Sequence, residues 1–197
     1  MNTSSHILMG GFLQQYMGDH YGIRLDRRSY ILGNVMPDYC PSFLLRPHYL
    51  RNNAAHVRSI LRILLARRPS AFDDKRYSRL LGILCHFYAD FFCHAHSDSF
   101  EGNLSDHIAY EKKLHRYFEE NLERFRSLRF IAQPQPVGGA EGVYGQFEAL
   151  HSCYLLSRTS LGNDLLFTMT ACVELIVLAA ECTAPAAAYH FDNLAAV

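Results

Sequence analysis

The stretch LGILCHFYADFFCHAHSDSFEGNLSDHIAYEKKL, residues 81–114, carries four ionisable side chains in two pairs of equal spacing. His86 and Asp90 are four residues apart, and so are His107 and Glu111, with His96 between the two pairs. Four residues are about one turn of an α-helix, so each pair projects from one helix face and can grip one ion. Imidazole with carboxylate is a ligand set that zinc accepts. The stretch therefore predicts helices that carry a site for more than one metal ion.

The first pair lies in a strongly apolar segment. Asp90 stands in HFYADFFCH, where most of its neighbours are aromatic or aliphatic. Charged side chains are very rarely buried unless they are paired or bind a metal. A single buried His–Asp pair is more often a structural pair than a metal site. Two pairs with a His between them favour metal, because one cause then explains all of these residues.

Helical patterns continue through the rest of the chain. Ser4 or Ser5 is expected to cap a helix that ends near Asp19, and Asp26 is expected to cap a helix that ends near Met36. Asn52 or Asn53 is expected to cap a helix that ends near Arg67. Ser105 or Asp106 is expected to cap a helix that ends near Arg126. Further helices are expected over residues 76–93, 140–157 and 161–182.

Pro37 is expected to end the second helix, because proline has no N–H to donate. Residues 70–74 are expected to form a turn, and residues 1–5 to be mobile. Repeats, alternating strand patterns and linkers are not apparent. The sequence predicts an all-α fold, a single-domain helical bundle over residues 1–197 with a polynuclear zinc site in its core.

The composition narrows the possible partners. There are 19 basic and 19 acidic residues, so neither long nucleic acid nor electrostatic docking on a membrane is indicated. The start MNTSSHILMG lacks a basic region followed by a long apolar core, which predicts a cytoplasmic protein with six reduced cysteines. Residues 165–180 include Thr168 and Glu174, so they are expected to form a buried core helix and not a transmembrane segment.

The polar residues in this order resemble the motifs of the bacterial zinc-dependent phospholipase C family, whose fungal relatives are single-strand nucleases. The resemblance covers about residues 5–114. It rests on His6, on GNVMPD ending at Asp38, on His48-Tyr49, on His86-x3-Asp90-x5-His96 and on His107-x3-Glu111. His56 competes with His48, and His94 competes with His96. The aromatic Tyr49 and the five-residue gap after Asp90 favour His48 and His96.

The resemblance implies a role for each of these residues. Asp38, His48, His86 and Asp90 would bind one zinc ion, and His96, His107 and Glu111 a second. Asp90 would bridge to a third ion that His6 also binds, and Asp38 would act as general base. Secreted family members complete the third site with an N-terminal Trp, and this chain has no Trp. The third ion is therefore expected to be the most weakly held.

The predicted activity is zinc-dependent hydrolysis of a phosphodiester by a zinc-activated water, with a phospholipid headgroup or similar substrate. The alternatives are hydrolysis of a nucleotide or another soluble phosphodiester, and a zinc-stabilised protein without catalysis. Five aromatic residues near the ligands are candidate walls of the site, although each is more often ordinary core: Tyr39, Phe43, Tyr49, Phe87 and Tyr110.

Overall fold

A computed structural model describes residues 1–40, 47–66, 75–132 and 138–183 of the chain. These residues form eight α-helices and one 3-10 helix and contain no strand, which confirms the predicted all-α bundle. The elements are α1 (Thr3–Tyr21), α2 (Arg27–Tyr39), α4 (Leu50–Leu65), α5 (Lys75–Phe91), η1 (His94–His96), α6 (Leu104–Glu120), α7 (Leu122–Ser127), α8 (Gly139–Leu156) and α9 (Leu161–Thr183). The turn expected at 70–74 and the candidate wall Phe43 lie outside the described residues.

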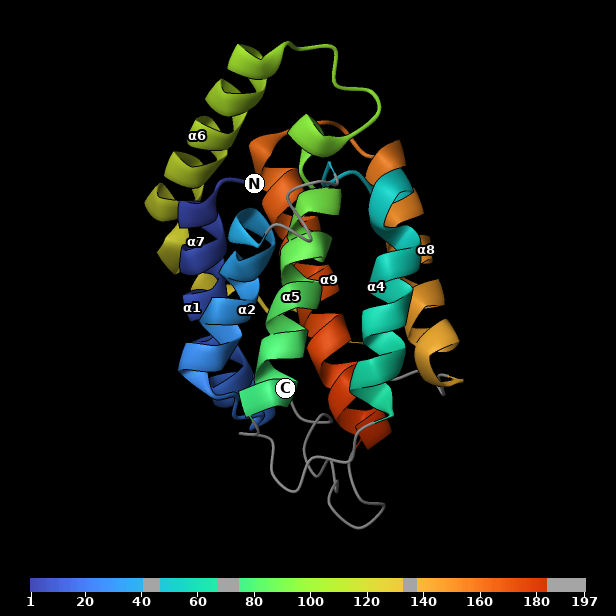
Figure 1. Ribbon diagram of the computed structural model, residues 1–197. Coiled ribbons are helices and arrows are strands. Elements are labelled where there is room, and N and C mark those ends of the chain that lie inside the picture. The colour runs from blue at the N-terminus through green and yellow to red at the C-terminus, as the bar shows by residue number, and fades with distance from the viewer. Residues whose placement is uncertain (41–46, 67–74, 133–137, 184–197) are drawn as a thin grey trace.

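Helix α5 runs through the middle of the bundle, with α2, α4 and α9 packed around it (Figure 1). Every residue of α5 from Leu81 to Phe91 is buried. A helix that is apolar on all sides is stable only when other elements cover it completely. His86 and Asp90 therefore lie inside the protein, each with no exposed surface.

The start of the chain is ordered, and the expected mobility of residues 1–5 is wrong. Asn2, not Ser4 or Ser5, caps α1, since its side-chain oxygen accepts a hydrogen bond from the Ser5 amide at 2.9 Å. Met1 is buried in the core cluster. At the other end, Gly22 adopts a left-handed conformation with φ of 65°, which ends the helix in the way glycine favours.

Helix α2 begins as predicted, with Asp26 as its cap, but it does not end at Pro37. It continues to Tyr39, because proline removes only its own N–H and the next turn closes with a bond from the Cys40 amide to the Met36 carbonyl at 2.9 Å.

Two other predicted caps are wrong. Tyr49 precedes α4, and the buried Asn53 donates its amide to the Pro47 carbonyl at 2.8 Å instead of capping the helix. Asn103 caps α6, and its own amide donates a hydrogen bond to the Asp106 carboxylate at 3.0 Å, which completes a capping box.

The expected helix to Arg126 is interrupted. It breaks at Asn121, between α6 and α7. Asn121 bonds back to the Tyr117 carbonyl at 2.8 Å, and asparagine often competes with the helix in this way.

Helix α9 contains the segment predicted as a buried core helix. By length and composition it could cross a membrane, with a mean hydropathy of 1.9, but 67% of that window is buried inside the bundle. Buried core helices commonly have these properties, so α9 is weak evidence for a membrane span.

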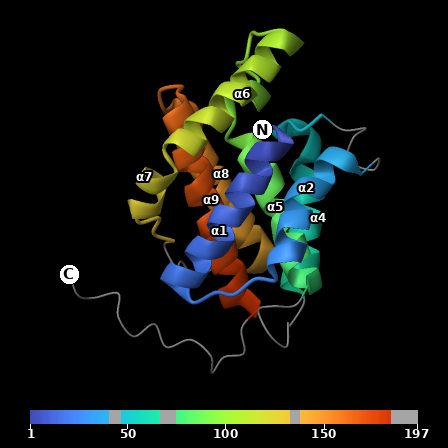
Figure 2. The same cartoon turned by 90° about the vertical axis from the view of Figure 1, so that its left-hand side faces the viewer.

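The segments that carry the predicted metal ligands meet at one end of the bundle. The N terminus, the C-terminal ends of α2 and α5, the start of α4 and η1 all lie at this end (Figure 1). Helix α6 leaves the bundle here, and its first turns extend beyond the other helices in both views (Figure 2).

Candidate metal centre

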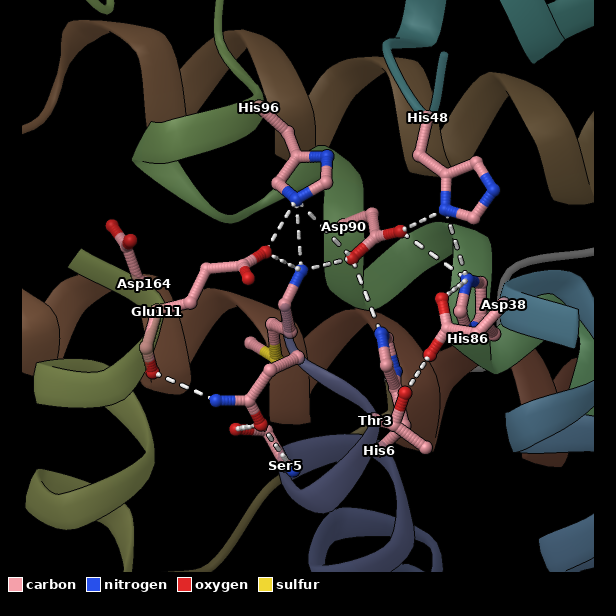
Figure 3. A network of polar contacts seen from close by, with 12 residues as sticks. Thr3, Ser5, His6, Asp38, His48, His86, Asp90, His96, Glu111 and Asp164 are labelled. Atoms are coloured by element: carbon pink, nitrogen blue, oxygen red, sulfur yellow. Dashed lines mark hydrogen bonds and ion pairs between the residues drawn. The ribbon is translucent and has the colours of Figure 1, made fainter. Parts of the chain in front are cut away.

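Three groups of possible metal ligands lie at this end of the bundle. In each group the ligand atoms lie within 4.8 Å of one another. The groups are His6, Asp38 and His86; His48, His86 and Asp90; and His96, His107 and Glu111. Together they contain all eight residues predicted as ligands, and no other residue of the described chain. Four helices, η1 and the segment before α4 supply these side chains. Figure 3 labels all of them except His107.

The second group is built around the middle of α5. Nδ1 of His86 lies 2.8 Å from the Asn34 carbonyl oxygen, so this nitrogen donates to α2, while Nε2 faces the other ligand-type residues. Nε2 lies 3.2 Å from Nδ1 of His48 and 3.3 Å from Oδ2 of Asp90. Nδ1 of His48 is 2.9 Å from the same carboxylate oxygen. Two imidazoles and one carboxylate therefore aim at one point.

His6 is the least satisfied polar residue of the centre. It is completely buried, and neither of its ring nitrogens has a hydrogen-bond partner. Its ring stacks on His86 at 3.8 Å, and its Nε2 lies 3.3 Å from Oδ1 of Asp90. Buried polar atoms without partners are rare and costly, so this imidazole is suited to a ligand that the protein itself does not provide.

The third group uses the second helical pair. His107 and Glu111 lie one turn apart on α6, with Nε2 of His107 at 3.2 Å from Oε1 of Glu111. Nε2 of His96, from η1, lies 3.0 Å from the same oxygen. The fold thus completes a His–His–Glu set from two separate elements.

The α-amino group of Met1 lies between the second and third groups, because it contacts residues of both. It forms an ion pair with Asp90 and lies 3.0 Å from Nε2 of His96 and 3.2 Å from Oε1 of Glu111. Burial alone would lower the pKa of this amine, but the charges of Asp90, Cys93 and Glu111 and the hydrogen bond to Asp90 together outweigh burial and raise it to about 12. A cation is therefore already favoured at this position.

The charges of the centre are those that a metal site requires. Burial disfavours the anion of Asp90, but the terminal ammonium and the imidazoles of His96 and His86 hold its pKa well below the usual range. Burial likewise opposes ionisation of Glu111, yet hydrogen bonds from His107 and His96 lower its pKa.

The imidazoles differ among themselves. Burial lowers the pKa of His6 to about 4 and also lowers that of His96, which keeps both rings neutral. Burial would lower the pKa of His48 too, but the hydrogen bond and the charge of Asp90 raise it. Neutral imidazole with ionised carboxylate is the donor set of zinc, and His6 and His96 with Asp90 and Glu111 supply it here.

The remaining histidines stay outside the three groups. His56 and His94 therefore do not replace His48 and His96 within the described part of the chain. Nδ1 of His94 instead lies 3.2 Å from the Ser97 hydroxyl. The other described histidines make contacts outside the three groups: His20 with Tyr16, His115 with Ser5 and Glu119, and His151 with the Phe91 carbonyl. His190 lies outside the described residues.

The candidate walls separate into different environments. Phe87 is fully buried and belongs to the core, which is the more common role of such an aromatic residue. Tyr39 is 65% exposed beside Asp38, and the Tyr49 ring lies 6.1 Å from that of His96. Tyr110 donates its hydroxyl to Asp164 at 2.8 Å.

Sequence reasoning missed three residues that support the ligands. Thr3 donates its hydroxyl to Oδ2 of Asp38 at 2.6 Å, and the Asn34 carbonyl orients His86. Asp164 of α9 accepts a hydrogen bond from the backbone of His94 at 2.8 Å. Thr3 and Asn34 have no special spacing from the residues they support. For Asp164 a weak signal existed, because it is an acidic residue in an apolar helix.

Comparison with protein families agrees with this geometry. A family model described as zinc dependent phospholipase C matches residues 5–154, which include all eight donor residues, and this confirms the resemblance found in the sequence. Comparisons with curated protein sequences and with solved structures find no match.

Proposed function

This chain belongs to the zinc-dependent phospholipase C family, and we propose from that membership that it hydrolyses a phosphodiester with two or three zinc ions. The observation that carries the proposal is the convergence of eight His, Asp and Glu side chains on one end of the bundle. Asp38, His48, His86 and Asp90 would hold the first ion, and His96, His107 and Glu111 would hold the second. His6 and Asp90 would hold the third.

Zinc ions held close together, when bound, lower the pKa of water and stabilise the charge on the phosphate oxygens of an in-line displacement. The chain's own contribution is to place donors on both sides of the Asp90 carboxylate. Its two carboxylate oxygens face different partners, Oδ2 toward His48 and His86 and Oδ1 toward His6 and the Met1 amine. This one carboxylate therefore contacts neighbouring donor groups, and its negative charge would offset part of the repulsion between cations bound there.

Asp38 is the general base in this proposal. Its side chain keeps 19% of its surface exposed, whereas Asp90 has none, so substrate water can reach Asp38. Thr3 holds Oδ2, and Oδ1 lies 3.8 Å from Nε2 of His86. Asp38 takes a proton from the attacking water as the water oxygen bonds to phosphorus. The bond from phosphorus to the leaving alcohol oxygen breaks, and that oxygen takes a proton from solvent.

A phospholipid is the substrate class that the surroundings support best. Exposed apolar side chains stand beside the donors on two elements. Tyr39 follows Asp38, and on α6 Leu104 is 75% exposed and Ile108 43% exposed, next to His107. The aliphatic Leu104 and Ile108 favour contact with acyl chains over contact with a nucleotide, for which aromatic stacking platforms and basic groups are typical.

The test combines metal analysis with a substrate panel. Protein purified without chelator should contain two or three zinc ions by elemental analysis. It should release a phosphorylated headgroup from phosphatidylcholine vesicles faster than it cleaves a dinucleotide. Asp38→Asn should lower kcat by about 10²-fold, the contribution typical of a general base. His20→Ala, which changes a histidine outside the three groups, is the control and should retain activity.

The outcomes separate the alternatives. Faster cleavage of the dinucleotide would support a soluble phosphodiester as substrate. Bound zinc without cleavage of either substrate would leave a zinc-stabilised, non-catalytic protein and refute the proposed activity.

A further inference from the structure

Asp164 is a buried carboxylate that joins four parts of the fold. It lies near the start of α9 and has no exposed surface. Its Oδ2 accepts hydrogen bonds from the His94 amide and the Tyr110 hydroxyl, both at 2.8 Å. Its Oδ1 accepts one from the Tyr154 hydroxyl of α8 at 3.0 Å. It lies beyond the residues that the family model matches, 5–154.

We infer that Asp164 is a positioning residue for the second metal group, because its Oδ2 ties the turn that carries His96 to the helix face that carries His107 and Glu111. This inference rests on the proposed function, since it assigns Asp164 to the metal centre described there. Figure 3 draws Asp164 on the Glu111 side of the cluster, away from His48.

The connection is short on both sides. His94 opens η1, and His96 follows two residues later in the same 3-10 turn. Tyr110 immediately precedes Glu111 on α6 and follows His107 by three residues. A single oxygen therefore holds the backbone of one ligand-bearing element and a side chain of the other. A shift of either element would lengthen one of the two bonds.

Packing alone does not require a carboxylate at this position. The side chains around it on α9 are mostly apolar, and a buried charge costs free energy that hydrogen bonds only offset. Three donors aimed at one buried anion instead restrict its orientation and that of the groups it holds. Groups that fix metal ligands in this way typically affect metal affinity by 10- to 100-fold.

Two tyrosines supply a matched pair of variants. Tyr110→Phe and Tyr154→Phe each remove one hydroxyl bond to the same carboxylate, but only Tyr110 stands on the helix of His107 and Glu111. Zn²⁺ affinity of the full chain is measured by competition with a chromophoric chelator. Tyr110→Phe should lower the affinity for one zinc ion by about 10-fold. Tyr154→Phe should change that affinity by less than about 2-fold. Both should lower the Tm by similar amounts, because each loses one comparable bond.

The affected ion can be identified by combination with a ligand variant. In a His107→Ala background, Tyr110→Phe should not change the affinity for the remaining ions, because the site it supports has already been removed. The absorption spectrum of Co²⁺-substituted Tyr110→Phe protein should also differ from that of wild type, whereas that of Tyr154→Phe should not.

Conservative replacement of Asp164 separates geometry from charge. In Asp164→Asn the amide oxygen can still accept from His94 and Tyr110, while the amide nitrogen donates to the Tyr154 oxygen. Its Zn²⁺ affinity should stay near that of wild type, and that of Asp164→Ala should fall by about 10-fold or more.

Three results would overturn the inference: equal effects of the two tyrosine variants on Zn²⁺ affinity, no effect of either, or equal losses in Asp164→Asn and Asp164→Ala. These measurements read metal binding and not turnover. If wild-type protein binds zinc but cleaves no phosphodiester, the proposed activity fails while the role of Asp164 is still decided by the affinities.

Discussion

Gly33 of α2 and Gly82 of α5 face each other where the two helices touch, and neither position has room for a side chain. A Cβ at Gly33 would lie 2.2 Å from the Arg79 carbonyl oxygen, and one at Gly82 would lie 2.2 Å from that of Tyr30. The two backbones are therefore in direct contact. This contact brings the Asn34 carbonyl within hydrogen-bond distance of His86 and carries Asp38 to the centre.

Gly33→Ala should separate these helices. The added methyl meets backbone and not a flexible side chain, so α2 must move, and overpacking of this kind typically costs about 1–3 kcal/mol. Zn²⁺ affinity should fall with stability, because α2 carries Asp38 and α5 carries His86. Denaturant unfolding and chelator competition measure the two effects.

Gly11→Ala is the matched control for this variant. Gly11 is also a helix glycine, but a Cβ there meets nothing within 4 Å. Alanine should stabilise the helix by about 0.5–1 kcal/mol. A Gly33→Ala protein as stable as wild type would show that α2 and α5 do not depend on this contact.

Removal of metal should destabilise the protein. An ion at a free concentration of 1,000 times its Kd adds about 4 kcal/mol to folding. For a domain of this size that corresponds to a Tm lower by about 10 °C in the chelated protein. Thermal melts with and without chelator measure the shift, and added Zn²⁺ should restore the original Tm. An identical Tm for both forms would contradict a metal site in the core.

Thr3 should affect the rate through Asp38. Its hydroxyl donates to Oδ2 of Asp38 at 2.6 Å, so Thr3→Val removes a hydrogen bond to a charged group without a change of shape. Bonds of this kind are worth about 1.5–3 kcal/mol, and kcat should fall by about 10- to 100-fold while KM changes little. The control is Thr170→Val, which removes only a local bond to the Leu166 carbonyl. Unchanged kcat in Thr3→Val would exclude an orienting role for this hydroxyl.

Glu174 should make stability depend on pH. Burial raises its pKa from 4.5 to about 7, so the folded state binds a proton more tightly than the unfolded state does. The stability linked to this proton is complete below about pH 4.5 and is lost as the pH rises through about 7. The Tm of Glu174→Gln relative to that of wild type should therefore rise as the pH is raised from 5 to 8.

The exposed Glu120 provides the comparison for this measurement. Glu120→Gln removes the same charge outside the core and controls for that loss. A Tm difference between Glu174→Gln and wild type that is the same at pH 5 and pH 8 would mean that Glu174 titrates alike in the folded and unfolded protein.

Much of the centre was predictable because helical spacing is local. The separation of four residues places His86 with Asp90 and His107 with Glu111 in any α-helix, wherever that helix packs. The apolar run around Asp90 predicted that its helix is buried, since such a surface is stable only away from water. All eight donors came from such spacing or from the family resemblance, and the structure brings all eight into the three groups.

The helix boundaries show where local reasoning fails. Ser105 and Asn103 are both good caps in isolation, and only the reciprocal bond with Asp106 selects Asn103. Asn53 has the right side chain for a cap, but the packed Pro47 carbonyl takes its amide instead. At each of these positions the sequence allows more than one hydrogen bond, and the final packing decides which one forms.

Sequence alone determined the helical class, the two His–carboxylate pairs and the donor types, because each depends on residues within about one helical turn of each other. Only the tertiary structure decided that the Met1 amine enters the centre, that Gly33 meets Gly82, and that Asp164 joins His94 to Tyr110. These contacts join segments that are distant in the chain. They exist because burial of the apolar faces packs the helices in one arrangement, which no local spacing specifies.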